Sequence, residues 1–128
     1  MKSNTEYLES VISSYRNLDE LMFLSPIAIY DLNQVILFSS QQYRQVRGEQ
    51  AQEGNRGLPD ELGQYFQSQS LKEQEEIIQT RTPNYSINFN YYEGIVQPYT
   101  TNKKPLINPD NNEVAGLYVE LRKILYTN

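Results

Sequence analysis

The side chains in this sequence that are able to do chemistry are tyrosines and carboxylates. The 128 residues include 11 tyrosines and 16 aspartates and glutamates, but no cysteine and no histidine. A tyrosine beside a carboxylate can act as an acid–base pair, so a small enzyme of that kind is one hypothesis. No spacing in the sequence singles out such a pair. A tyrosine also joins an apolar ring to a hydroxyl that needs a partner, which suits a cavity wall or an interface.

The missing residue types exclude several kinds of site. Without cysteine there is no disulfide, no thiolate nucleophile, no iron–sulfur cluster and no thiol adduct to a flavin. Without histidine there is no imidazole base and no histidine-ligated haem, and a zinc site would have to use carboxylates alone. We therefore expect no enzyme and no metal site. Non-covalent flavin binding and binding of an unidentified small molecule stay open.

Three charged clusters are candidates for ligand contacts. Two are acidic: residues 60–61, and Glu73 with residues 75–76. No other type of metal ligand is nearby, so we interpret both as solvated acidic faces. The third is the basic pair Lys103 and Lys104, which we expect to solvate a turn, with an anion contact as the alternative.

Length and charge point to one domain and away from nucleic acid. A chain of 128 residues with 38% apolar residues fits a single core. The net charge is −5 and no segment is strongly basic, so we expect no direct contact with nucleic acid. No apolar run is long enough to span a membrane, and residues 1–6 lack the apolar core of a signal peptide. The sequence therefore predicts a cytoplasmic location without membrane contact.

Alternating side chains between residues 83 and 125 predict three antiparallel strands. Residues 85–92 alternate apolar and polar, with Tyr85 and Ile87 on the face expected to point inward. A second strand is predicted at 95–101, after which residues 103–108 lead into a turn at 109–112. The third strand, at 113–125, keeps Leu117, Val119 and Leu121 on one face.

Two further strands are predicted nearer the N-terminus. Residues 27–30 and 35–38 are short apolar runs joined by a hairpin at 31–34, as expected in the middle of a covered sheet. Short helices are predicted at 41–46, 58–66 and 71–80, with a glycine-containing mobile loop at 47–57. Two strands, a helical block and three strands predict an α+β fold with a five-stranded antiparallel sheet and helices on one face.

An amphipathic helix is predicted before the first strand. Ser3 and Glu6 have the spacing of a capping box. Apolar residues then recur at helical spacing: Leu8, Val11, Ile12, Tyr15 and Leu18. This stripe either packs on the chain's own sheet or joins the helix of a partner. We expect residues 1–24 to form a flanking helix and residues 25–128 the main domain.

Several motifs resemble the PAS domain. Residues 24–31 (Leu-Ser-Pro-Ile-Ala-Ile-Tyr-Asp) are similar to the entry into the first PAS strand, and residues 35–43 to the second strand and the short helix after it. Residues 103–117, Lys-Lys-Pro-Leu-Ile-Asn followed by a turn and Val-Ala-Gly-Leu, resemble the passage between the last two strands of many bacterial sensory PAS domains. Ser39 and Ser40 depart from the family, which often has an asparagine there. The resemblance covers residues 18–124.

The resemblance implies a sensory or regulatory module of a signalling or transcription regulator. PAS domains bind small ligands, dimerise and pass the result to an output domain, which here would lie in the same or a partner chain. A ligand pocket between the helices and the sheet would be lined by Ile29, Phe38, Tyr43, Leu62, Phe66, Ile78, Ile87, Asn88, Phe89, Tyr99, Leu117 and Val119. The alternative is a protein-interaction domain whose core is filled and which binds no ligand.

The resemblance also implies a homodimer. In PAS proteins a flanking helix of this kind commonly packs across the sheet or pairs with its copy. The candidate interface residues are Leu8, Val11, Ile12, Tyr15, Tyr92 and Tyr118.

Overall fold

The computed structural model describes residues 1–20, 25–47, 53–54, 61–92 and 95–124, and within 61–70, 88–92 and 95–96 only the backbone. The elements follow in the order α1 (Asn4–Glu20), β1 (Ile27–Tyr30), β2 (Ile36–Ser39), α2 (Gln41–Arg47), α3 (Glu61–Thr80), β3 (Asn84–Tyr92), β4 (Ile95–Asn108) and β5 (Glu113–Lys123). The five strands form one sheet in the order β2-β1-β5-β4-β3, with antiparallel neighbours throughout. The predicted α+β fold with a five-stranded antiparallel sheet is confirmed.

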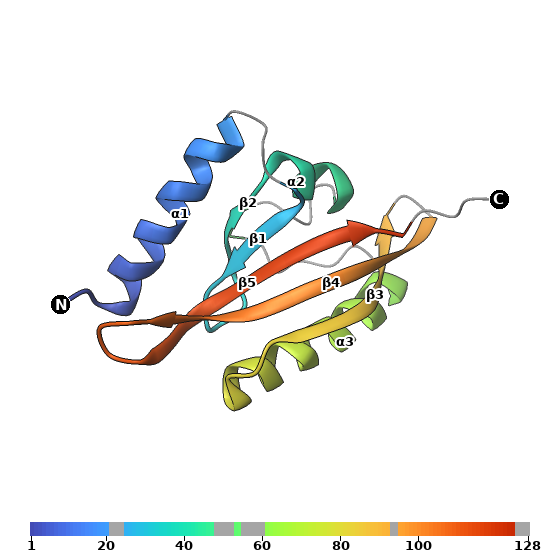
Figure 1. Cartoon of the computed structure of the whole chain (residues 1–128). Helices are drawn as coiled ribbons and strands as arrows, with labels where there is room; N and C mark the ends of the chain where they lie inside the picture. The colour runs from blue at the N-terminus through green and yellow to red at the C-terminus, as the bar shows by residue number, and fades with distance from the viewer. Residues whose placement is uncertain (21–24, 48–52, 55–60, 93–94, 125–128) are drawn as a thin grey trace.

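The sheet separates two clusters of buried side chains. Figure 1 shows α1 and α3 on opposite sides of the sheet. The first cluster lies under α1 and contains Leu8, Ile29 and Phe38. The second lies under α2 and α3 and contains Tyr43 and Ile77. We call these two sides the α1 face and the helical face.

Helix α1 begins where the capping box predicts. The Ser3 hydroxyl accepts a hydrogen bond from the Glu6 amide at 3.2 Å, and the Glu6 carboxylate accepts one from the Ser3 amide at 3.2 Å. Hydrogen bonding of the Glu6 carboxylate, mainly to the Ser3 backbone and less to the Ser3 side chain, lowers the pKa of Glu6. The two reciprocal contacts satisfy amides that a helix start leaves without partners.

Gly116 allows α1 and β1 to approach β5 closely. A Cβ atom at this position would lie 2.4 Å from the Tyr30 carbonyl oxygen and 3.1 Å from Leu8 Cδ2. Real side chains do not tolerate the first distance, so only glycine fits without a shift of β1. The small residue in β5 therefore fixes how near the flanking helix sits.

Strand β3 presents the opposite face from the one predicted. Tyr85 is 71% exposed and Ile87 is 60% exposed, while Ser86 between them points toward α3. The register explains this: Ser86 pairs with Thr101 of β4, and directly paired residues share a face. Because the side-chain period of a strand is two, an inward Ser86 forces both apolar neighbours outward.

Two predicted boundaries in the second half of the chain were wrong. The helices predicted at 58–66 and 71–80 are one helix of 20 residues within the described range, α3. The run at 103–108, predicted to lead into a turn, belongs to β4, which continues past the last β3 pair, Asn84 with Lys103. Pro105 pairs with Leu117 of β5 in this extension. The loop predicted at 47–57 lies mostly outside the described residues.

Candidate functional site

A buried lysine lies between the sheet and α3. Lys103 is 1% exposed, and its Nζ lies 3.8 Å from Glu73 Oε2 of α3. Burial lowers the pKa of Lys103 to about 8; the Glu73 charge opposes the shift and the Arg47 charge adds to it. The prediction that Lys103 solvates a turn was wrong, since the residue faces the interior from within β4. A charge this deep is costly unless polar groups surround it.

Polar groups extend from the Lys103–Glu73 pair along the interior. The Ser86 hydroxyl donates to Glu73 Oε1 at 2.6 Å and lies 3.1 Å from the Thr101 hydroxyl. Within the described residues, the buried Asn84 Oδ1 has no hydrogen-bond partner. Asn84 is the cross-strand neighbour of Lys103, so a cation and an acceptor lie side by side on the same face. Such a group can bind a small polar molecule that offers both an acceptor and a donor.

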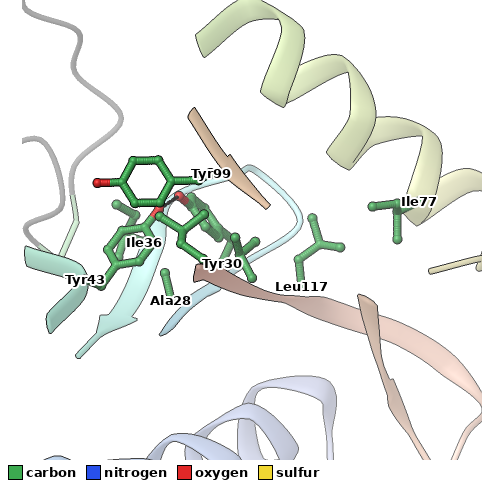
Figure 2. Close-up of a cluster of buried hydrophobic side chains, with 9 residues drawn as sticks. Ala28, Tyr30, Ile36, Tyr43, Ile77, Tyr99 and Leu117 are labelled. Atoms are coloured by element: carbon green, nitrogen blue, oxygen red, sulfur yellow. Dashed lines mark hydrogen bonds between the residues drawn. The ribbon is translucent and has the colours of Figure 1, made fainter. Parts of the chain in front are cut away.

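A second polar group lies beneath α2. Figure 2 shows the Tyr30 and Tyr43 hydroxyls meeting end to end, at 2.8 Å, with Tyr99 beside them and Ile77 at the far end of the cluster. Burial raises the pKa of Tyr30 well above its ordinary value, so this phenol is neutral. Their mutual bond uses one of two phenolic protons. The Arg47 guanidinium lies 5.8 Å from the centre of the Tyr43 ring. This end of the interior is therefore rich in donors.

The predicted pocket residues fall on both faces. Tyr43, Tyr99, Leu117 and Val119 lie together on the helical face, with Ile78 packed against them. Two others, Ile29 and Phe38, lie on the α1 face. They cannot line an interior under α2 and α3, because neighbouring strand residues point to opposite sides. The outward-facing residue Ile87 cannot line it either. The side chains of Leu62, Phe66, Asn88 and Phe89 lie outside the described part of the structure.

The polar members of the site are the residues that sequence reasoning missed. They are Tyr30, Glu73, Asn84, Ser86, Thr101 and Lys103. One signal could have found two of them: Tyr99 was predicted to face inward, and Thr101 and Lys103 follow it at a spacing of two. Because Thr101 and Lys103 are polar, they were not expected to be buried, but the register of β4 in the sheet places both of them in the interior.

The predicted dimer residues are used within the chain. Leu8 is 6% exposed under α1, with Val11, Ile12 and Tyr15 packed on the same cluster. The ring of Tyr15 lies 5.8 Å from that of Tyr118. Of the two alternatives for the apolar stripe, the structure has the one in which it packs on its own sheet. The side chain of Tyr92 lies outside the described residues. A second copy at this surface stays a prediction.

Among the described residues there is no cluster of three acidic side chains that could hold a metal ion. In the same part of the chain, no helix has the length and apolar character needed to cross a bilayer.

Similarity to solved structures identifies the fold. No protein-family model matches the sequence, and no curated protein matches it. The PAS domain of a protein from Colwellia psychrerythraea matches with a TM-score of 0.61 and 12% identity, covering 77% of this chain and 85% of that one. The chain has the PAS fold. The predicted resemblance to PAS domains is thereby confirmed.

This PAS fold is also similar to chains of VqmA. The complex of phage VqmA with DPO matches with a TM-score of 0.65 and 21% identity, covering 89% of this chain and 55% of that one. The Vibrio cholerae VqmA dimer matches with a TM-score of 0.69 and 14% identity, covering 88% of this chain and 51% of that one. The chain spans about half the length of these VqmA chains.

Proposed function

We propose that this chain is a sensory PAS module that binds a small molecule between the sheet and helices α2 and α3. The observation that carries the proposal is the buried Lys103–Glu73 pair, with Lys103 1% exposed and the two charged atoms 3.8 Å apart. Beside this pair, the buried Asn84 Oδ1 has no hydrogen-bond partner among the described residues. A polar ligand that donates to Asn84 Oδ1 would satisfy this buried acceptor and lie next to the Lys103 charge.

The chemistry of the lining defines the class of ligand. Lys103 at one end and the Tyr30–Tyr43 pair at the other offer donors, while Asn84 Oδ1 offers an acceptor. A small, mostly apolar molecule with one or two oxygen or nitrogen acceptors and one donor fits this pattern. DPO is the first probe to test, because VqmA structures bound to DPO share the fold.

The same relatives support the regulatory context that we propose. A structure of V. cholerae VqmA is described as a dimer whose conformation shifts in the absence of target DNA. We propose that this chain also acts as a homodimer, is not an enzyme, and controls an output domain in the same or a partner chain without touching nucleic acid itself. Residues 1–24 would be its flanking segment and residues 25–128 its sensory domain. The cytoplasmic location stays a prediction.

Binding of DPO tests the ligand proposal. We expect isothermal titration calorimetry to give saturable binding, weakened at least about tenfold in Lys103→Met, since a hydrogen bond to a charged group contributes about 1.5–3 kcal/mol. Lys104→Met is the matched control, because the neighbouring lysine is exposed and lies on the α1 face. Equal losses in both variants would contradict the proposed site.

Native mass spectrometry of the purified chain tests for another ligand. A retained small molecule that is lost in Lys103→Met but kept in Lys104→Met supports the proposal with a ligand other than DPO. Absence of any retained mass, together with absence of DPO binding, would instead favour the protein-interaction domain with a filled core. Sedimentation equilibrium tests the dimer, and a monomer at all concentrations would overturn that part.

A further inference from the structure

Strand β3 forms an open edge of the sheet (Figure 1). It is the last strand in the order β2-β1-β5-β4-β3, and within the described residues only β4 pairs with it. The pairing runs without a bulge from Asn84 with Lys103 to Tyr92 with Ile95. An edge strand presents backbone amides and carbonyls that have no partner in the sheet, and these are a template for another strand. The nine residues of β3 therefore offer a long and regular edge.

The odd-numbered residues of β3 direct their backbone groups to this open edge. In β4, the Pro98 carbonyl accepts the Ile124 amide at 3.2 Å, so the even-numbered residues of β4 direct their backbone groups away from β3. The odd-numbered residues of β4 direct theirs toward β3, where Thr101 pairs with Ser86. Ser86 and the other even-numbered residues of β3 thus bond to β4. Ile87 and the other odd-numbered residues have their amides and carbonyls at the edge.

Two large apolar side chains stand beside this edge. Tyr85 is 71% exposed and Ile87 is 60% exposed; apart from Met1, they are the most exposed large apolar residues in the described part of the chain. The buried cluster beneath α1 contains residues of the other four strands but no described residue of β3. In the described structure, α1 therefore leaves the outer side of β3 uncovered.

Strand β3 carries no charged residue. Its sequence, Asn-Tyr-Ser-Ile-Asn-Phe-Asn-Tyr-Tyr, also lacks proline, whereas 21% of the whole chain is charged. Edge strands are commonly protected by charges, by proline or by a bulge, and β3 has none of the three. A charged peptide would find no charge on this strand to pair with. Two copies of a chain with net charge −5 can meet here without opposing like charges, because a second β3 is uncharged as well.

An antiparallel pairing of β3 with its own copy uses the whole strand. A twofold axis at Asn88, the middle residue of β3, sets Ile87 opposite the partner's Phe89 and Tyr85 opposite the partner's Tyr91. All of these residues are odd-numbered, so the four symmetric pairs are of the hydrogen-bonded kind and contribute about eight bonds, at two per pair. Asn88 meets the partner's Asn88 as a pair of the closer, non-hydrogen-bonded kind.

We propose that the homodimer forms by antiparallel pairing of the two β3 edges, which joins five strands from each copy into one sheet. The inference rests on the proposed homodimer and names its interface. It uses nothing of α1, whose apolar residues pack within the chain. Strand addition of this kind gains its affinity mainly from main-chain hydrogen bonds. Because the interface is small, we expect a dissociation constant in the micromolar range.

Sedimentation equilibrium of the full chain tests this interface when one edge donor is removed. Ile87→Pro deletes an amide that points to the edge and not to β4, and edge strands accept proline at such positions. Both copies lose the bond, so we expect the dissociation constant of the dimer to rise at least about tenfold. Ile87→Val keeps the amide and is the matched control; it should leave the dissociation constant nearly unchanged.

A cysteine on the twofold axis gives a second, independent readout, because the chain has no cysteine of its own. Asn88→Cys sets two Cα atoms about 4.5 Å apart, within the range of a disulfide. We expect mild oxidation to give a covalent dimer. Tyr85→Cys is the matched control at an exposed position of the same strand. Its two copies lie about six residues apart along the seam, or ~20 Å, which a disulfide cannot span.

Asn102→Lys separates the edge from the outer face of the sheet. Asn102 is exposed on β4 as the cross-strand neighbour of Tyr85, away from the edge. This variant should leave the dimer intact. If it disperses the dimer while Ile87→Pro does not, the copies meet face to face and the inference is overturned.

The remaining outcomes separate this inference from the proposed function. A wild-type dimer that Ile87→Pro leaves unchanged overturns the β3 interface, and the proposed homodimer stands. A wild-type chain that is monomeric at all concentrations overturns the homodimer and this interface together, whereas binding of DPO beside Lys103 is unaffected. Equal oxidation of Asn88→Cys and Tyr85→Cys would indicate random collision and overturn the register.

Discussion

Lys103 and Lys104 are neighbours in β4 and lie on opposite faces of the sheet. Lys103 is buried beneath α3 beside Glu73, whereas Lys104 is exposed and lies 4.7 Å from the centre of the Tyr118 ring. The helical face thus holds charged and polar groups away from water, whereas the buried cluster of the α1 face consists of apolar and aromatic side chains. This difference is the reason why we propose the helical face, and not the α1 face, as the place where a ligand binds.

Truncating a leucine on each face should give unequal losses of stability. Leu117 is fully buried on the helical face, while Leu106 is 9% exposed at the margin of the α1 face. We expect Leu117→Ala to lower the free energy of unfolding by about 3–5 kcal/mol and Leu106→Ala by about 2 kcal/mol, because the second site can relax toward solvent. Urea unfolding measures both. Equal losses would mean that the faces are packed alike.

Adding a methyl group at Gly116 should strain the α1 face. The new Cβ would meet the Tyr30 carbonyl oxygen at 2.4 Å, and a strand backbone cannot easily yield. We expect Gly116→Ala to lower the free energy of unfolding by about 2–3 kcal/mol. The same urea titration checks it, and a neutral result would show that β1 and α1 can move apart.

The stability of the chain should depend on pH through Lys103. Its pKa is about 8 in the folded chain against an ordinary 10.5, so between these values the unfolded chain binds more protons. Stability is therefore lowest below pH 8 and rises as the pH increases, by about 2 kcal/mol between pH 7 and 9.5. Urea midpoints across this range measure the slope. Lys103→Met should lose this rise and Lys104→Met should keep it; a slope present in both variants would assign it to other groups.

Removing one hydroxyl from each face should give the smallest contrast. Tyr43→Phe leaves the buried Tyr30 hydroxyl without its partner at 2.8 Å, which should cost about 1–2 kcal/mol of unfolding free energy. Tyr118→Phe removes a partly exposed bond to Glu120 at 3.1 Å and should cost about 0.5 kcal/mol. Thermal unfolding of the two variants compares them. A larger loss for Tyr118→Phe would reverse the assignment of the polar face.

Much of the fold could be read from apolar periodicity. The inward set of β5, the capping box at Ser3 and Glu6, and the hairpin at 31–34 follow from local pattern and turn chemistry. The hairpin is confirmed by the Asp31 carboxylate, which accepts a hydrogen bond from the Val35 amide at 2.9 Å. These features depend on residues close in sequence.

Which side chains of the site face inward depends on the register between strands, and register cannot be read from residues that are close in sequence. Ser86 faces inward because it pairs with Thr101, and this turns Ile87 outward against the apolar pattern. Hydrophobicity assigned Ile29 and Phe38 to the pocket, but a sheet covered on both faces has two apolar sides. A buried lysine is rare enough that Lys103 could be placed only once its neighbours across the sheet were known.

Pro105 stands in the part of β4 that extends beyond β3. Leu121 of β5 donates its amide to the Pro26 carbonyl, so the odd-numbered residues of β5 direct their backbone groups toward β1. The even-numbered residues therefore direct theirs toward β4, where Tyr118 pairs with Lys104. The backbone nitrogen of Pro105 consequently points to the open edge, where it carries no hydrogen. A foreign strand that tried to add there would find a donor missing from its ladder. Pro105 thus disfavours the addition of a foreign strand at this edge, and it leaves the pairing of β4 with β5 intact.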